Sequence, residues 1–226
     1  MTPQFPRAEI PAAPHLQFEQ SLWADGFNCL GGLDEAGRGA WAGPVAAAVV
    51  ILPVDVGILE RLAGVRDSKL MTPAQRTFWA ARIRSEALET GVGYASAAEI
   101  DRLGILPATR LAMQRALGHL HCTPQHLLID ALRLPAVPTA QTALIKGDAR
   151  SLSIAAASVL AKTGRDAWMR AAERDCPGYG FAQHKGYGTA VHQAALRQLG
   201  ISSIHRRSFA PVARHLSLIP CGDDSD

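Results

Sequence analysis

Four carboxylates stand at or just beyond the ends of short apolar runs, and they are the main chemical signal in the chain. They are Asp34, Glu35, Asp130 and Asp148. Clustered carboxylates repel one another unless protons or cations neutralise them. Mg²⁺ prefers a few carboxylates together with waters and phosphate oxygens, and two such ions can stabilise the attacking and leaving oxygens of a displacement at phosphorus. The pattern therefore favours metal-dependent phosphodiester hydrolysis.

Each acid also has a simpler explanation. The Asp34-Glu35 pair can be an ordinary solvated turn, and Asp130 can be a turn residue before the Pro135–Pro138 loop. Asp148 can assist Ser151 in capping the helix that follows. Only the joint placement of the four acids favours a site, so we leave out Asp166, which we expect to form a surface ion pair with Arg170 one helical turn later.

A glycine-arginine-glycine segment follows the first two acids directly. Gly37 and Gly39 flank Arg38, so the backbone is free to adopt positive φ and to approach a ligand closely. Successive side chains of a strand alternate between faces. The chain must therefore bend here if Asp34 and Glu35 are to serve one site.

Several basic residues and two of the chain's three tyrosines follow the apolar run that leads to Asp148. The basic ones are Lys146, Arg150, Lys162, Arg165, His184, Lys185, Arg206 and Arg207. They lie where a phosphate backbone could run, although most can equally be solvated surface charges. Tyr179 and Tyr187 can stack on a sugar or a base, or can anchor a loop by packing.

The elements that must position these residues alternate between strand and helix. Apolar runs predict strands at residues 29–33, 44–52, 92–95, 126–129 and 143–145, the second of them buried on both faces. Helical periodicity and caps predict helices at residues 73–90, 106–120, 151–174 and 189–199. This order predicts an α/β sheet flanked by helices, with a C-terminal helical region. In such a sheet, ligands bind at the strand ends where the acids fall.

Within the predicted helices, we expect two apolar stripes to be buried. Phe78, Ile83 and Leu88 recur at helical spacing after the cap formed by Thr72 and Pro73. The next helix offers a stripe formed by Leu111, Met113, Leu117 and Leu120. We interpret both stripes as core, without a role in chemistry.

Composition limits the class of protein. The chain has 226 residues, of which 48% are hydrophobic and 19% are charged, with a net charge of +3. No apolar run reaches the roughly 18 residues of a membrane helix, and no signal sequence is apparent, so we expect a cytoplasmic protein without a membrane partner. The four cysteines lack paired spacing and are expected to be reduced.

The proline-rich residues 1–17 are expected to lie over the fold or to be partly disordered, and residues 221–226 to form a frayed acidic tail.

In these motifs, the chain resembles the bacterial ribonuclease HII family. The resemblance rests on Asp34-Glu35-Ala36-Gly37-Arg38-Gly39, Asp67-Ser68-Lys69-Leu70, Ile129-Asp130, Lys146-Gly147-Asp148, Ser153–Ser158 and Tyr179–Gly188. These segments occur in the family's order between about residues 30 and 211. The resemblance implies a ribonuclease H-like fold with a central mixed five-stranded sheet flanked by helices. It also implies three parts: an N-terminal extension at 1–25, a catalytic domain at 26–188 and a C-terminal helical region and tail at 189–226.

The resemblance further implies an endonuclease that cuts the RNA strand of RNA/DNA hybrids. It would also nick duplex DNA on the 5′ side of single embedded ribonucleotides, leaving 3′-hydroxyl and 5′-phosphate ends. By the family pattern, the four acids hold two Mg²⁺ or Mn²⁺ ions. The Gly37-Arg38-Gly39 segment would recognise the ribose 2′-hydroxyl, and Tyr187 would press on the next deoxyribose. Substrate contacts are expected from Lys146, Lys185, Arg206 and Arg207, and the protein is expected to be a monomer.

Two positions depart from the family pattern. Ala131 stands where the family usually has glycine, which can shift the loop after the third acid. Gly164 interrupts the long predicted helix and should weaken it by about 1 kcal/mol relative to alanine.

Two other functions remain open from the residues alone. One is a nuclease or recombinase of the same fold that acts on DNA without ribose, and the other is a non-catalytic nucleic-acid-binding protein.

Overall fold

A five-stranded mixed sheet is the centre of the molecule. This computed structural model describes residues 10–216. The strands are β1 (Leu30–Ala36), β2 (Val45–Ile51), β3 (Glu89–Ala95), β4 (His126–Asp130) and β5 (Ala140–Leu144). They lie in the order β3-β2-β1-β4-β5. β2 runs antiparallel to both of its neighbours, whereas β1, β4 and β5 run parallel, so the sheet is mixed as expected.

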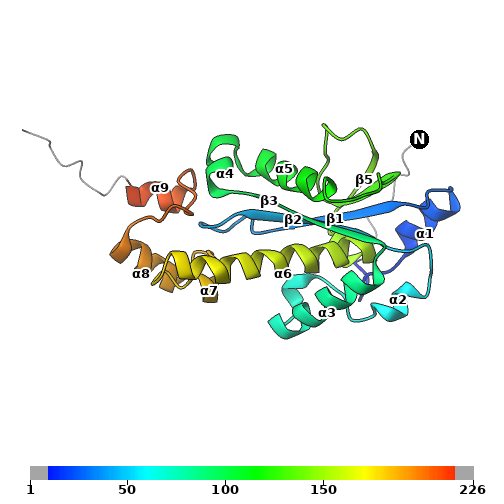
Figure 1. Ribbon diagram of the computed structural model, residues 1–226, viewed down its shortest axis with the longest axis horizontal. Helices are drawn as coiled ribbons and strands as arrows, with labels where there is room; N and C mark the ends of the chain where they lie inside the picture. The colour runs from blue at the N-terminus through cyan, green and yellow to red at the C-terminus, as the bar shows by residue number, and fades with distance from the viewer. Residues whose placement is uncertain (1–9, 217–226) are drawn as a thin grey trace, which may run out of the picture.

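Helices cover both faces of the sheet. The α-helices are α1 (Gln17–Ala24), α2 (Ile58–Arg61), α3 (Pro73–Glu86), α4 (Ala97–Leu103), α5 (Ile105–Leu117), α6 (Leu152–Asp175), α7 (Phe181–His184), α8 (Ala190–Leu199) and α9 (Ala210–Leu216). The described residues also contain two short 3₁₀ helices, η1 (Ser68–Leu70) and η2 (Gly147–Ala149). In Figure 1, α4 and α5 lie on one face, α6 and α3 on the other, and α8 and α9 at one end. No helix within residues 10–216 combines the length and apolarity that crossing a bilayer requires.

The alternation of side chains along the strands produces two cores. Leu33, Val49 and Ile129 face α5, where they pack with Met113. On the opposite face, small residues allow α6 to approach the sheet closely. A Cβ added at Gly32 would lie 2.4 Å from the backbone carbonyl carbon of Ser153, so only glycine fits there. Because Asp34 is two residues beyond Gly32, strand alternation directs its side chain toward α6 as well.

The predicted elements are present, with several differences at their ends. α3 begins as expected, with Thr72 as N-cap, Pro73 at the first helical position and Gln75 completing a capping box with Thr72. It ends at Glu86 rather than near Gly91, because residues 89–95 pair with β2 as β3. The helix predicted at 106–120 is preceded by a separate helix, α4. All of β2 is buried, as expected.

The predicted apolar stripes are only partly confirmed. Ile83 is buried, but Phe78 and Leu88 are exposed, because Phe78 points away from the sheet and Leu88 falls after the helix has ended. Met113 in α5 is fully buried. Leu111 and Leu117 of the same helix, and Leu120 just after its end, are partly buried and pack against the same core.

The N-terminal region also contains structure that we did not expect. α1 packs on the sheet through Phe18 and Leu22. Glu19 is buried, and its Oε1 accepts hydrogen bonds from Ser151 Oγ at 2.6 Å and Ser153 N at 3.0 Å. α1 therefore stabilises the beginning of α6. The expectations for residues 1–9 and for the tail at 221–226 lie outside the described residues.

The three cysteines within the described residues are free thiols, as expected: Cys29, Cys122 and Cys176. Cys29 Sγ lies 3.4 Å from Cys122 Sγ, which is a closer approach than their sequence spacing indicated.

Candidate active site

The register of the parallel strands brings the first and third acids together. Leu33 in β1 pairs with Ile129 in β4, so the next residues along the two strands are Asp34 and Asp130. Asp34 is buried, with 3% of its surface exposed, and Asp130 is half-buried at the end of β4. Asp148 is buried in η2, just after β5. Asp130 Oδ1 accepts a hydrogen bond of 2.7 Å from the N–H of Gly147, which ties the end of β4 to η2.

Burial and mutual repulsion raise the pKa values of Asp34, Glu35 and Asp130. Burial, followed by the charges of Glu35 and Asp130, raises the pKa of Asp34 well above its ordinary value. Burial also raises the pKa of Asp130 to about 6, with Asp148 and Glu35 adding to the effect. The pKa of Glu35 is raised by burial, although Arg38 opposes the shift. These acids therefore interact electrostatically as one cluster, in an environment that favours a bound cation.

The carboxylate oxygens of this cluster suit divalent cations that keep part of their hydration shell. Glu35 Oε2 is buried and has no hydrogen-bond partner. Within residues 10–216, no group of three or more acidic, histidine or cysteine side chains is arranged so that it could hold a metal ion by itself. Mg²⁺ is usually bound by one or two carboxylates, several waters and substrate oxygens, so an open carboxylate cluster fits it better than it would fit a structural zinc ion.

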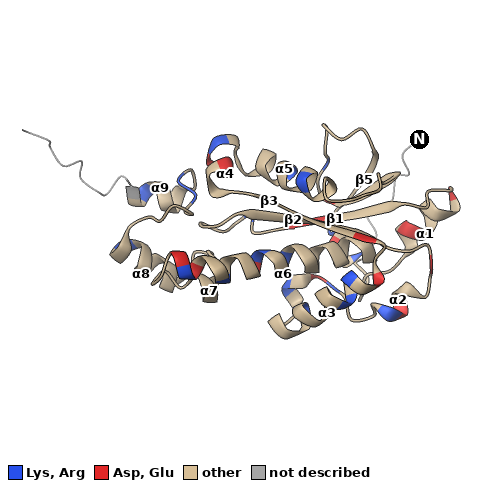
Figure 2. Cartoon of the chain, in the orientation of Figure 1, with Lys and Arg blue, Asp and Glu red and all other residues tan. Residues whose placement is uncertain are grey.

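Three of the four acids line one cleft of about 670 Å³: Asp34, Glu35 and Asp130. The Gly37–Gly39 segment, Lys69 and Tyr187 line the same cleft. Asp148 is not among the residues that line this cleft, but its Oδ2 lies 3.5 Å from Nζ of Lys69, which does line it. Figure 2 shows the corresponding charge pattern, with acidic positions on the central strands and basic positions along α6 and α3.

Two buried arginines shape the Gly37-Arg38-Gly39 loop from within. Gly37 has φ +94°, and a Cβ there would lie 1.9 Å from Arg165 Nε, so the position requires glycine. Arg206 donates to the carbonyls of Gly37 at 2.7 Å and Arg38 at 2.8 Å. The Arg38 side chain points outward and pairs with Glu35 at 3.2 Å. The loop is therefore preorganised, and its outer surface faces the cleft.

The predicted phosphate contact of Arg206 is wrong, because this side chain is fully buried and hydrogen-bonds to backbone carbonyls. Arg165 and His184 are buried for a similar reason. Arg165 donates to Pro44 O, Ala42 O and Lys185 O, and His184 Nε2 lies 2.7 Å from Tyr179 O. These residues support the loops and do not present charge at the surface.

Other predicted substrate residues have accessible side chains. Lys146 and Arg207 are exposed, and Lys185 is half-buried. Tyr187 is 37% exposed, and Lys162 Nζ and the Arg165 guanidinium lie 5.6 and 5.4 Å from the centre of its ring.

The remaining candidates lie elsewhere or have structural contacts. Arg150 packs over the ring of Phe18, at the N-terminal end of α6. Tyr179 is buried and stacks on Phe181, so it is a packing anchor.

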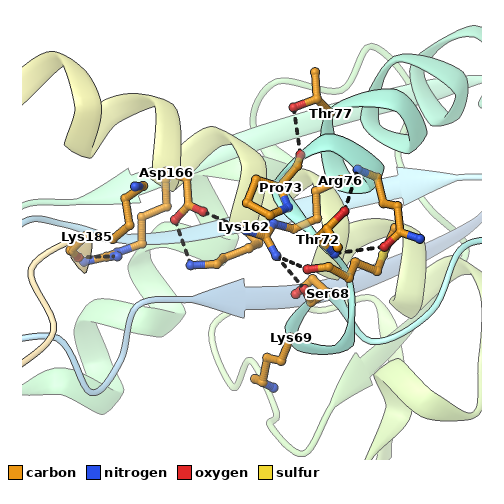
Figure 3. A network of polar contacts seen from close by, with 12 residues as sticks. Ser68, Lys69, Thr72, Pro73, Arg76, Thr77, Lys162, Asp166 and Lys185 are labelled. Carbon is orange, nitrogen blue, oxygen red and sulfur yellow. Dashed lines mark hydrogen bonds and ion pairs between the residues drawn. The ribbon is translucent and has the colours of Figure 1, made fainter. Parts of the chain in front are cut away.

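The structure groups three basic side chains at the cleft, of which only Lys162 was among the expected phosphate contacts. Figure 3 shows Lys162 and Arg76 on either side of Asp166. Lys162 Nζ lies 2.7 Å from Asp166 Oδ1, and Arg76 Nη2 lies 3.4 Å from Asp166 Oδ2. Arg76 Nη1 also donates to Ser68 O, next to Lys69 in the sequence. Arg170 was therefore the wrong partner for Asp166, which is buried between α6 and α3. Lys69, Arg76 and Lys162 all line the cleft. For Lys69, the Asp67-Ser68-Lys69 segment was the available sequence signal; Arg76 carried none.

Both departures from the family pattern have visible consequences. Ala131 adopts φ +49°, a left-handed conformation that glycine accommodates with less strain. At Gly164, a Cβ would lie 2.8 Å from the hydroxyl oxygen of Tyr94, so the glycine allows α6 to pack against β3.

Comparisons with known proteins agree with this architecture. The family model described as Ribonuclease HII matches residues 31–212. A Ribonuclease HII from Synechococcus sp. is 53% identical over 199 residues, which cover 88% of this chain and 89% of that protein. The solved ribonuclease H2 from Pyrococcus horikoshii OT3 is 26% identical, with a TM-score of 0.68, and the match covers 84% of this chain and 97% of that one. Bst-RNase HIII in complex with Mn²⁺ has a TM-score of 0.65 at 20% identity, covering 84% and 69% of the two chains, and so shows the fold alone.

Proposed function

The chain belongs to the ribonuclease HII family, whose members hydrolyse the RNA strand of RNA/DNA hybrids, and we propose that its four clustered acids form a two-metal-ion centre for this reaction. The ligands in this proposal are Asp34, Glu35, Asp130 and Asp148. The observation that carries it is the single cleft that combines repelling acids, a preorganised glycine-rich loop and an accessible tyrosine. The Mn²⁺ complex of Bst-RNase HIII, which has the same fold, is compatible with Mg²⁺ or Mn²⁺ as the ions.

When bound, divalent ions would supply Lewis-acid stabilisation of the negative charge that develops at a phosphodiester. The protein groups around them hold the substrate in place. Lys69, Arg76 and Lys162 bring positive charge to the same cleft, where they can bind the phosphates that flank the cleaved bond. We assign outer phosphate contacts to Lys146, Lys185 and Arg207.

We further propose that the enzyme nicks duplex DNA on the 5′ side of a single embedded ribonucleotide. Only the 2′-hydroxyl distinguishes RNA from DNA at a given site. The backbone of Gly37-Arg38-Gly39 can approach that hydroxyl closely because Gly37 and Gly39 carry no side chain. Tyr187, on the same cleft, would pack against the deoxyribose that follows. The products would carry 3′-hydroxyl and 5′-phosphate ends.

In this proposal, residues 26–188 carry the chemistry, with 1–25 and 189–226 as flanking regions. α8, within the C-terminal region, contributes His192, whose side chain contacts the backbone of Tyr187, so this region supports the cleft. We also propose that the enzyme acts as a monomer in the cytoplasm. Sedimentation of the purified chain and fractionation of cells would test these two points.

A cleavage assay on two substrates tests the function. One is a long RNA/DNA hybrid, and the other is a DNA duplex with one ribonucleotide. With Mg²⁺ or Mn²⁺, we expect both to be cut, the second on the 5′ side of the ribose, and EDTA to stop both reactions. Asp34→Asn is expected to abolish cleavage while hybrid binding persists. Asp55→Asn, at an exposed acid that pairs with Arg61 away from the cleft, is the matched control and should retain activity.

Two results would contradict this proposal. Cleavage of ribose-free duplexes at a similar rate would favour a DNA nuclease of the same fold. Tight hybrid binding without any metal-dependent cut would favour a non-catalytic binding protein.

A further inference from the structure

Three histidines form a buried cluster directly behind Tyr187. They are His184 at the end of α7, His192 in α8 and His205 in the segment before α9. All three are buried, and His192 is completely so. The rings of His184 and His192 stack at 4.5 Å between centroids, and those of His192 and His205 lie 5.2 Å apart. The cluster lies outside the acidic cleft.

Hydrogen bonds define the protonation of two of these rings. His205 Nδ1 accepts from the backbone N–H of Ser202 at 2.9 Å, so in the neutral ring its proton is on Nε2. That Nε2–H donates to His192 Nε2 at 3.0 Å. His192 must then carry its own proton on Nδ1, which donates to the carbonyl of Tyr187 at 3.0 Å. The result is a directed chain from Ser202 through His205 and His192 to Tyr187.

This series of hydrogen bonds requires the rings of His192 and His205 to be uncharged, because protons on both of the facing Nε2 atoms would repel each other. Burial, followed by the charge of His192, lowers the pKa of His205 to about 4. Burial also lowers the pKa of His192, with His184 adding to the effect. The charges of His184 and His215 lower the pKa of His205 further. The two rings are therefore neutral at ordinary working pH.

The two ends of this series of hydrogen bonds reach the two loops to which we assign substrate recognition. At one end is the backbone of Tyr187. At the other, His205 is followed by Arg206, whose guanidinium holds the carbonyls of Gly37 and Arg38. The backbone N–H of Arg206 also donates to Trp41 O at 2.8 Å, next to the same loop. A continuous set of hydrogen bonds and one peptide link therefore connect the two loops.

We propose that His192 and His205 are positioning residues that fix Tyr187 relative to the Gly37–Gly39 loop and so set the preference for an RNA–DNA junction. The inference rests on the proposed junction-reading role of Tyr187. Neither histidine touches substrate. They act by directing one hydrogen bond onto the Tyr187 carbonyl, and a loop held this way presents its ring in one place. A ribonucleotide junction needs that placement, whereas a long RNA tract offers many equivalent binding positions.

The two amide substitutions at His192 separate this role from packing. The side-chain nitrogen of asparagine can occupy the position of Nδ1, so His192→Asn keeps a donor for the Tyr187 carbonyl and loses the contact with His205. Glutamine reaches the position of Nε2, so His192→Gln keeps an acceptor for His205 and loses the donor for Tyr187. Both variants remove the ring, so a pure packing role predicts similar effects.

The measurement is kcat/KM on a duplex with one ribonucleotide divided by kcat/KM on a long RNA/DNA hybrid. We expect His192→Gln to lower this ratio about tenfold and His192→Asn to stay within about threefold of wild type, the difference reflecting one hydrogen bond. In a Tyr187→Ala background, His192→Gln should lower the ratio no further, because both changes act through the same ring. Thermal unfolding of each variant monitors folding.

The possible failures are distinguishable. If Tyr187→Ala leaves the ratio at the wild-type value, the proposed junction role of Tyr187 is wrong. If Tyr187→Ala lowers the ratio but His192→Gln and His192→Asn behave alike, or the double variant shows additive losses, the positioning role is overturned. Should the His192 variants fail to fold, the same comparison is made at His205. There glutamine keeps the donor toward His192 and should preserve the ratio, whereas asparagine should lower it, and equal ratios would refute the inference.

Discussion

Replacing Arg206 by glutamine tests whether this residue holds the Gly37–Gly39 loop from inside. The guanidinium is completely buried, and it donates to Gly43 O at 3.0 Å, Arg38 O at 2.8 Å and Gly37 O at 2.7 Å. It also packs over the ring of Phe209 at 5.0 Å. A glutamine amide is shorter and can replace at most one of these contacts, so at least two carbonyls lose a charged donor.

The expected loss of stability follows from those two carbonyls. A hydrogen bond to a charged group contributes about 1.5–3 kcal/mol. We take the lower value because burial, followed by the charge of Arg165, lowers the pKa of Arg206 to about 9, so keeping this charge buried already carries a cost. Two lost bonds then destabilise the fold by roughly 3 kcal/mol. In a chain of this size, that lowers Tm by about 6–12 °C.

The assay combines thermal unfolding with hybrid binding at several salt concentrations. Arg206→Gln should lower Tm and weaken binding, but the dependence of binding on salt should stay as in wild type, because a buried guanidinium contacts no phosphate. The exposed neighbour provides the matched control. Arg207→Gln should leave Tm nearly unchanged and reduce the salt slope by about one phosphate contact. A wild-type Tm for Arg206→Gln, or a reduced salt slope in that variant, would refute the reasoning.

Three further predictions concern the backbone and the acids. Ala131→Gly should stabilise the protein by about 1 kcal/mol in urea unfolding, because φ +49° strains alanine; an unchanged midpoint would contradict this. Gly32→Ala should destabilise it by about 1–3 kcal/mol, since the new Cβ would meet the backbone of Ser153, and a wild-type midpoint would exclude that clash. In metal-free protein, the pKa of Asp130 is raised from 3.8 to about 6, so its stabilising contribution is full below pH 3.8 and is lost as pH rises through 6. Asp130→Asn should therefore gain Tm relative to wild type between pH 4 and 7, and a constant difference would count against the shift.

The sheet and its acids could be predicted because their signals are local. An apolar run that ends on an acid predicts a buried strand with a carboxylate at its end, as in the strand that ends on Ile129-Asp130. The continuous apolar run of β2 likewise predicted burial on both faces, which the structure confirms. The C-terminal end of α3 was less predictable, because pairing of β3 with β2 overrides helical periodicity after Glu86.

The roles of the arginines could not be predicted from sequence. Arg206 and Arg207 are adjacent and chemically identical, yet one is buried and the other is exposed. The difference arises because the carbonyls of Gly37 and Gly43 point inward and bind Arg206. This partner lies more than 160 residues away along the chain. Asp166 is similar. Its partner Arg76 comes from another helix, which the i+4 spacing to Arg170 did not reveal.

Counting bound ions tests the four-acid centre most directly. Electron paramagnetic resonance of free Mn²⁺ would give the number of ions bound to the complex with a ribonucleotide duplex whose cleavable linkage is blocked. We predict two ions for wild type and for the control Asp55→Asn, and the loss of at least one ion in both Asp130→Asn and Asp148→Asn. Equal ion counts in all four proteins would contradict a metal centre built on these carboxylates.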